Sequence, residues 1–195
     1  LYSHRSTTLH AYAIALPDVI AMRATTRILP VVPMFHVNAW GIPYASALVG
    51  ASMVMPGRHL DGKSLSELLN TERVTMTCGV PTVWLGLLQH LRSSGEKLEH
   101  HPRIMTGGSA APPLLVDAFR EEFGVTVEHG WGMTELSPVG TYNAPKPAQA
   151  GLTGPALTAH TMKQGRILPG LDMKIVGGDG AELPWDGQAF GDLKV

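Results

Sequence analysis

Short apolar segments alternate with amphipathic helical segments over the first two thirds of this chain. The apolar segments span residues 28–32, 52–55, 74–78, 103–106 and 125–128. Strand, helix and strand at this spacing predict parallel strands that are joined by right-handed crossovers. The chain is therefore expected to have an α/β fold, in which a layered and mostly parallel sheet is flanked by helices.

Three amphipathic patterns separate the predicted strands. Ser64 and Glu67 match a capping box at the start of the first pattern. Thr82 is the expected cap of the second pattern, and the proline pair at 112–113 and Gly124 are the expected start and end of the third. The apolar residues that share a helical face in these patterns are Leu65, Leu68, Leu69, Trp84, Leu87, Leu88, Leu91, Leu114, Leu115, Ala118 and Phe119.

The composition changes near residue 150. We expect this position to separate an α/β part, residues 1–150, from a β-rich part of the same domain, residues 151–195. The segment 140–165 is rich in Ala, Pro, Thr and Gly, has little periodicity, and is expected to be irregular. Residues 173–176, which precede a glycine-rich turn at 177–180, and residues 191–195, which follow it, are predicted to form antiparallel strands.

Two loops of small residues follow predicted strands. The first spans residues 107–112, and the second spans residues 130–135 with the sequence Gly-Trp-Gly-Met-Thr-Glu. A glycine-rich turn at a strand end lets backbone N–H groups approach a nucleotide closely, and ligands of parallel sheets bind at such ends. The second loop adds an aromatic ring, a hydroxyl and a carboxylate, which suit adenine, phosphate and phosphate-bound magnesium. Together the two loops predict a nucleotide site.

These loops, with the segment 33–41 of sequence Pro-Met-Phe-His-Val-Asn-Ala-Trp-Gly, closely resemble the acyl-CoA synthetases of the adenylate-forming superfamily. The resemblance extends over essentially the whole chain. It is nearest to the branch that activates medium- and long-chain fatty acids and that contains 3-methylmercaptopropionate-CoA ligases. The family makes an acyl-adenylate from a carboxylic acid and ATP, and then transfers the acyl group to coenzyme A. The resemblance thus implies ATP or AMP, Mg²⁺, coenzyme A and a carboxylic acid as ligands.

The resemblance also implies roles for particular residues. Thr134 would contact the α-phosphate, Glu135 would hold magnesium, and Trp131 would stack on adenine. His36 would orient the acyl carboxylate and joins Thr134 and Glu135 as a catalytic candidate, while Trp40 is the candidate gate of the acyl pocket. The implied nucleotide-binding residues are Gly108, Ser109, Ala110, Ala111, Pro112, Gly130, Trp131, Gly132, Met133 and Thr134. The implied acyl-binding residues are His36, Val37, Asn38, Trp40, Gly41, Pro81, Thr82 and Gly107.

Each of these roles has a structural alternative. Trp40 and Trp131 are also typical of core anchors, and the loop 108–111 is also typical of a tight turn between a strand and a helix. Residues 80–84 either line an acyl tunnel or only begin a buried helix. The pair His100 and His101 is expected to be exposed, and no histidine has the spacing of a zinc ligand.

The sequence departs from the family at both ends. In the family, a phosphate loop rich in Ser, Thr and Gly precedes a Tyr-Ser-His-Arg-like segment, which here occupies residues 2–5. The ribose-binding Asp and the catalytic Lys of the family are expected after Val195. The chain therefore resembles a central fragment of the large N-terminal domain and is expected to be inactive alone. The alternatives are a non-catalytic folded fragment or another α/β nucleotide-binding module, although no Gly-x-Gly-x-x-Gly opens a helix after the first strand.

Charge and cysteine content narrow the expected partners. The formal net charge is −1, so no overall field favours nucleic acid or a membrane surface. No apolar run reaches the roughly 20 residues that a bilayer span needs, and the chain starts without a signal-peptide pattern. The single cysteine, Cys78, excludes an internal disulfide and fits a reducing compartment. We therefore expect a cytoplasmic protein without a transmembrane segment, and a homodimer is compatible with the sequence.

Overall fold

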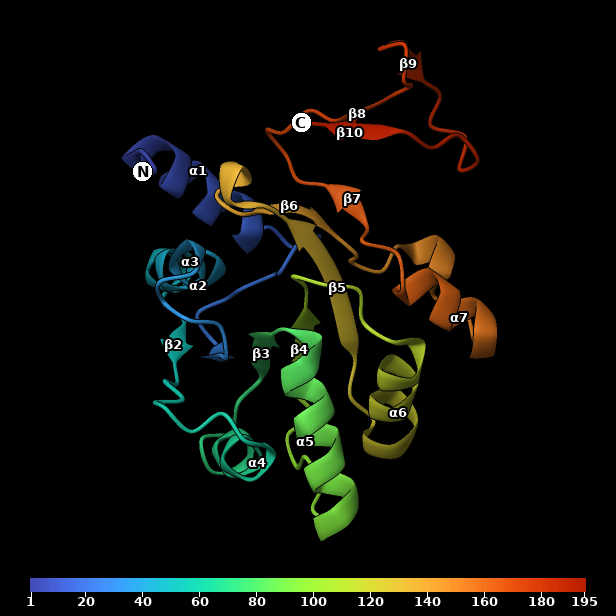
Figure 1. Ribbon diagram of the computed structural model, residues 1–195. Helices are drawn as coiled ribbons and strands as arrows, with labels where there is room; N and C mark the ends of the chain where they lie inside the picture. Colours follow the sequence, from blue (N-terminus) through green and yellow to red (C-terminus); the bar gives the residue numbers. More distant parts are fainter.

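A seven-stranded sheet lies between two groups of helices in the computed structural model, which describes residues 1–195 (Figure 1). The strand order is β2-β1-β3-β4-β5-β6-β7. Pairing is parallel from β2 to β5 and antiparallel from β5 to β7. The strands are β1 Arg27–Pro30, β2 Ser52–Met53, β3 Met76–Gly79, β4 Arg103–Thr106, β5 Val127–Gly132, β6 Val139–Tyr142 and β7 Arg166–Ile167. The predicted fold class is confirmed.

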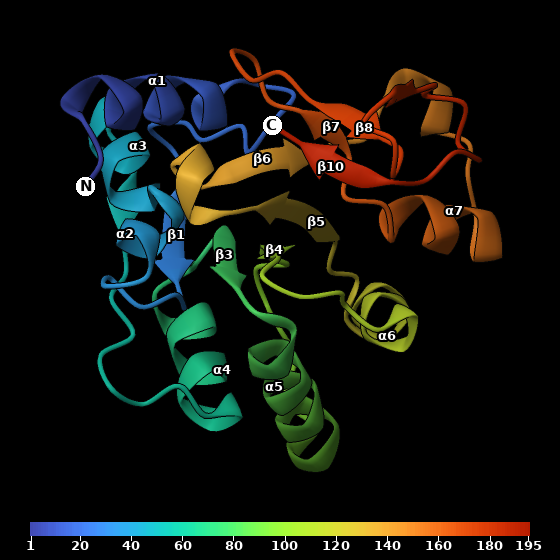
Figure 2. The same ribbon diagram turned by 45° about the horizontal axis from the view of Figure 1, so that its top comes forward.

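The helices cover both faces of this sheet, as the two views show (Figures 1 and 2). On one face lie α1, α2 and α3, and on the other lie α4, α5 and α6. The helices are α1 His4–Ala15, α2 Val37–Trp40, α3 Ile42–Val49, α4 Gly62–Thr71, α5 Pro81–Ser94, α6 Pro113–Phe123 and α7 Gly154–Thr161, and the 3-10 turns are η1 Thr134–Leu136 and η2 Pro147–Gln149. None of the helices combines the length and the apolar character required to cross a bilayer.

The core consists of two apolar clusters, one on each face of the sheet. Successive strand residues alternate between them, since Ile28 and Met105 belong to the cluster of α1 and α3, whereas Leu29 and Ile104 belong to the cluster of α4, α5 and α6. This alternation follows from the period of two along a strand. Both faces of the parallel strands are therefore buried, as expected when helices cover a sheet on both sides.

The helix boundaries correct two of the predicted caps. Asp61 caps α4 by accepting a hydrogen bond from the backbone N–H of Ser64 at 3.0 Å, so the predicted capping box of Ser64 and Glu67 is wrong. Helix α5 begins at Pro81, and its N-cap is Val80, two residues before the predicted cap Thr82. Helix α6 begins at the predicted proline pair and ends at Gly124, whose φ of 65° is left-handed.

The segment 140–165 is not irregular, contrary to the prediction. It contains most of β6, the turn η2 and helix α7. Residues 130–132 of the predicted loop 130–135 also lie in a strand, because β6 pairs with β5 as far as Gly132. The loop 107–112 does connect β4 to α6, as predicted.

A second sheet follows the first. It contains β8 Lys174–Val176, β9 Glu182–Leu183 and β10 Asp192–Lys194 in the order β10-β8-β9, with antiparallel pairing throughout. The predicted antiparallel strands near 173–176 and 191–195 are thus confirmed. Strand β7 lies after residue 150 but belongs to the larger sheet, and the boundary near residue 150 stays a prediction.

Candidate functional site

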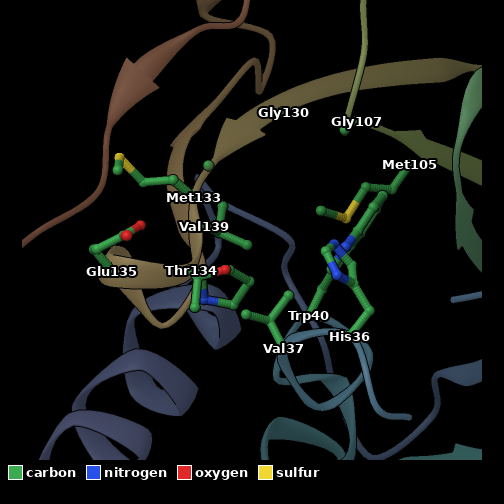
Figure 3. A pocket seen from close by; sticks show the side chains of 13 residues that line it. His36, Val37, Trp40, Met105, Gly107, Gly130, Met133, Thr134, Glu135 and Val139 are labelled. Carbon is green, nitrogen blue, oxygen red and sulfur yellow. The ribbon is translucent and has the colours of Figure 1, made fainter. Parts of the chain in front are cut away.

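A cavity of about 350 Å³ opens at the carboxyl ends of β4 and β5 (Figure 3). It is bounded by the segment that carries Trp40, by the ends of the two strands, and by η1. The lining residues are His36, Val37, Trp40, Met105, Gly107, Gly108, Gly130, Gly132, Met133, Thr134, Glu135, Pro138 and Val139. The cavity thus brings together the three segments that the sequence singled out, although they are up to about a hundred positions apart.

Some predicted residues lie outside this lining. They are Asn38, Gly41, Pro81, Thr82, Ser109, Ala110, Ala111, Pro112 and Trp131. Conversely, Met105, Pro138 and Val139 line the cavity and were not predicted. Met105 lies on the strand 103–106, where the period of two indicates that it faces away from its buried neighbours Ile104 and Thr106.

The carboxyl end of β5 presents different groups on its two sides. Gly130 and Gly132 line the cavity, whereas the residues between and before them, Trp131 and His129, alternate to the other side of the sheet. The indole of Trp131 lies over β6, because a Cβ placed on Gly140 would be 2.9 Å from its Cζ3. We call the side with Gly130 and Gly132 the cavity side of β5, and the side with His129 and Trp131 the indole side.

The indole side contains buried polar atoms that have no partner. Thr106 and His129 are register partners on β4 and β5, and both are buried. Neither the Thr106 Oγ1 nor the His129 Nδ1 makes a hydrogen bond, while the His129 Nε2 is 3.5 Å from the carbonyl oxygen of Ser109. An unpaired buried polar group costs about 1–3 kcal/mol, so these atoms under the loop 107–112 are suited to a polar ligand. Neither residue was predicted from the sequence, although the period of two places Thr106 on the same strand face as Ile104, and His129 on the same face as Trp131.

One wall of the cavity is a strained turn. Residues Val37, Asn38, Ala39 and Trp40 have φ angles of 46°, 53°, 49° and 58°, so α2 is left-handed, and each such residue costs about 1–2 kcal/mol. Strain of this kind persists where the surroundings hold it, and it is frequent at ligand sites. Figure 3 shows Trp40 and His36 facing the strand ends beside Met105.

Trp40 belongs both to the core and to the cavity. It is 6 % exposed, and its Cη2 would lie 3.6 Å from a Cβ placed on Gly107. Its ring therefore closes against the start of the loop 107–112. The gate interpretation and the core interpretation both remain consistent with this position.

Glycine is required where the cavity meets β6. A Cβ on Gly132 would lie 2.1 Å from the carbonyl oxygen of Pro138, a backbone atom that could not move without parting β5 from β6. The absent side chain lets the two strands approach closely and leaves the backbone of Gly132 open to the cavity.

Thr134 and Glu135 lie in η1, at the opposite end of the cavity from Trp40 (Figure 3). Both are exposed. The phenol of Tyr2 donates a hydrogen bond to the Thr134 carbonyl at 2.6 Å, and burial, with the nearby Glu135 charge, raises the pKa of Tyr2. No ion pair involves Glu135, so its carboxylate is free to bind a cation.

A charged cluster, in which Glu128 and Tyr142 are buried and Arg103 is partly exposed, lies next to the strand end that lines the cavity. Arg103 Nε and Nη2 donate to the Glu128 carboxylate at 3.1 and 2.5 Å, and its Nη1 donates to the Ile20 carbonyl at 3.1 Å. The Tyr142 hydroxyl donates to the same carboxylate, and burial, followed by the Glu128 charge, raises the pKa of Tyr142 well above its usual value. The cluster ties β4, β5 and β6 together two residues before Gly130.

The cavity lies at the carboxyl ends of parallel strands, which is where α/β proteins with open sheets bind their ligands. The chain belongs to the AMP-binding enzyme family, which matches residues 1–195.

Curated relatives agree with this assignment. The chain is 49% identical to the 3-methylmercaptopropionyl-CoA ligase of Ruegeria lacuscaerulensis, over 100% of the chain and 36% of the relative. It is 48% identical to the medium-chain-fatty-acid–CoA ligase of Ectopseudomonas oleovorans, over 99% of the chain and 35% of the relative. The chain thus spans about a third of the length of these relatives.

A solved structure has the same fold. The long-chain-fatty-acid-CoA ligase of Archaeoglobus fulgidus superimposes with a TM-score of 0.82 at 22% identity, over 99% of this chain and 38% of that one. The implied roles of individual residues are not tested by these likenesses and stay predictions.

Proposed function

We propose that the chain forms the acid- and nucleotide-binding part of an acid–CoA ligase. The enzyme would activate a carboxylic acid with ATP to an acyl-adenylate and transfer the acyl group to coenzyme A. The observation that carries the proposal is the single cavity in which the Trp40 segment, the glycine-rich strand ends and the Thr134–Glu135 pair meet. Its support is the match of the AMP-binding enzyme family over the whole chain.

The two sides of β5 suit the two parts of an acyl-adenylate. The cavity side has the apolar side chains of Val37, Trp40, Met105 and Val139, which suit an acyl chain. The indole side has Trp131 and the unpartnered His129 Nδ1, which suit the ring and the polar edge of adenine. The phosphate between these parts would lie near Thr134.

The arrangement suits the two steps of the proposed reaction. A carboxylate oxygen attacks the α-phosphorus and pyrophosphate leaves. The thiol of coenzyme A then attacks the acyl carbonyl, the bond from the acyl carbon to the phosphate oxygen breaks, and AMP and the thiol proton are released. His36 would orient the carboxylate, since it lies at the cavity end of the segment that also carries Trp40, and orientation contributes a large part of such rate enhancements. Backbone N–H groups and the Thr134 hydroxyl would contact the charged phosphate.

Magnesium fits the residues that are present. Mg²⁺ binds through one or two carboxylates together with substrate phosphates, and Glu135 is an exposed carboxylate of the cavity lining that has no cationic partner. Glu135 would therefore hold the ion, which would neutralise phosphate charge when bound.

A cytoplasmic location and a homodimeric state belong to the same proposal. The buried thiol of Cys78, whose pKa burial raises to about 12, has no partner for a disulfide.

The test is pyrophosphate release by the purified full-length gene product. The reaction should require ATP, coenzyme A and an acid, and mass spectrometry should detect the acyl-CoA. Octanoate, palmitate and 3-methylmercaptopropionate cover the substrates named for the relatives, and omission of the acid is the control. Absence of acid-dependent release in folded protein would contradict the proposal. The 195-residue chain alone is expected to release none.

A further inference from the structure

His10 lies on α1 behind the cavity and contacts both of its walls. Its ring is 7 % exposed. The Nε2 accepts a hydrogen bond at 3.1 Å from the backbone N–H of Val139, a lining residue that follows His10 by 129 positions. This bond fixes the position of the first residue of β6.

The Nδ1–Cε1 edge of the ring contacts the strained turn. A Cβ placed on Gly41 would be 2.7 Å from the His10 Nδ1 and 2.8 Å from its Cε1. Gly41 directly follows Trp40 and has a φ of 73°. The ring therefore fits into the space that the missing side chain leaves, and it buttresses the turn that carries Val37 and Trp40.

We propose that His10 is a positioning residue, which sets the separation between the Trp40 wall and the Val139 wall and thereby the size of acid that the cavity accepts. This inference rests on the proposed function. His10 touches neither the cavity nor a reacting atom, so it acts through Trp40 and Val139. Because Nε2 accepts a hydrogen bond, the ring is neutral and carries its proton on Nδ1.

The geometry predicts which substitutions preserve the role. Glutamine places an amide oxygen close to the position of Nε2, whereas asparagine places the same group one carbon short and cannot reach the Val139 N–H. Phenylalanine keeps a ring against Gly41 but leaves that buried donor unpaired. A buried donor that loses its partner disfavours the original arrangement of the two walls by a factor of about five or more in the equilibrium constant.

The experiment compares His10→Gln, His10→Asn and His10→Phe in the full-length gene product, with KM for ATP and for a series of saturated acids of increasing length. We expect His10→Asn and His10→Phe to raise the acid KM by about fivefold or more and to shift the preferred length, with little change in the ATP KM. His10→Gln should keep the original preference. Melting temperatures of all three variants are measured alongside.

Several outcomes would overturn the inference. They are an unchanged length preference in His10→Asn, an equal shift in the glutamine and asparagine variants, and a parallel rise of the ATP and acid KM. Unfolding of both amide variants would also overturn it, because His10 would then serve stability alone. If the unmodified protein shows no acid-dependent pyrophosphate release, the proposed function fails, which is a distinguishable result.

Discussion

The cavity side and the indole side of β5 are adjacent but differ in their chemistry. On the cavity side, Gly130 and Gly132 present only backbone, and the surrounding side chains are mostly apolar. On the indole side, Trp131 lies over β6 and His129 keeps an unpartnered nitrogen in a buried place. A strand with a period of two thus offers two different surfaces at the same end.

This difference indicates how a single strand end can serve two parts of one ligand. An apolar surface discriminates by shape, and a methylene group in such a pocket is worth about 1–3 kcal/mol. A buried polar atom discriminates by hydrogen bonding, because a wrong group leaves it unpaired. If the proposed function is right, substitutions on the two sides should change the kinetics of different substrates.

Glu135→Gln is expected to have the largest effect, because Glu135 lies in η1, beyond the end of β5 where the two sides meet. The amide keeps the shape but removes the charge that would hold magnesium. Adenylation in the full-length gene product should slow by about 100-fold or more, while thioester formation from supplied acyl-adenylate should change much less. The two half-reactions are measured separately.

Glu67→Gln on the exposed face of α4 is the matched control and should leave both half-reactions unchanged. Equal losses in the two half-reactions of Glu135→Gln would show that Glu135 has a structural role.

Acid should destabilise the support behind the cavity side. Burial lowers the pKa of His10 from 6.5 to about 4, so the unfolded chain takes up this proton at a higher pH than the folded chain does. The stabilisation is therefore present above pH 6.5 and is lost as the pH falls towards 4, by roughly 3 kcal/mol at most. Urea unfolding at pH 7 and pH 4.5 measures it. His10→Gln should lose less stability over this interval, and an identical loss in both proteins would contradict the assignment.

Trp131→Ala tests the indole side alone. Stacking of a base on an aromatic ring is worth about 1–3 kcal/mol, so the ATP KM should rise roughly 5- to 150-fold, with the acid KM nearly unchanged. Trp131→Phe keeps a ring and should recover most of the ATP affinity. If both substitutions raise the acid KM as much as the ATP KM, Trp131 is packing between β5 and β6.

The parallel half of the fold was predictable because its pattern is local. The buried strands and the stripes of α5 and α6 repeat with the periods of two and 3.6 that burial imposes. Helix α7 was missed because it has no buried residue. Its end is held instead by Asn143, whose amide donates to the carbonyl groups of His160 and Lys163 at 2.8 Å.

The candidate site was predictable where backbone chemistry demands a residue type. The loop 107–112 could be found in this way, whereas the roles of the Thr134–Glu135 pair and of the Trp40 segment depended on the family resemblance. All three line one cavity or lie beside it. Val139 and His10 could not be found, because their roles depend on contacts between residues 129 positions apart. The strand conformation of Gly130 to Gly132 likewise depends on β6, which glycine-rich sequence alone does not predict.

Trp40→Ala tests the cavity side in the corresponding way. The ring lies between the core and the start of the loop 107–112, so its removal should lengthen the cavity toward Gly107. We expect the preferred acid to become longer, with a change of about tenfold in relative kcat/KM between short and long acids. The ATP requirement for acid binding should weaken if the ring moves when nucleotide binds.

Trp84→Ala provides the control, because Trp84 is fully buried and its indole N–H donates to the Gly79 carbonyl at 3.1 Å. Both truncations remove a packed indole, and such truncations cost about 3–5 kcal/mol of stability. Only Trp40 lines the cavity, so only Trp40→Ala should change the chain-length profile. Melting temperatures and acid series on both variants separate the two effects. A large fall in melting temperature with an unaltered chain-length profile in Trp40→Ala would show that Trp40 serves only core packing. Selection of the acid by its chain length would then depend on Met105 and Val139.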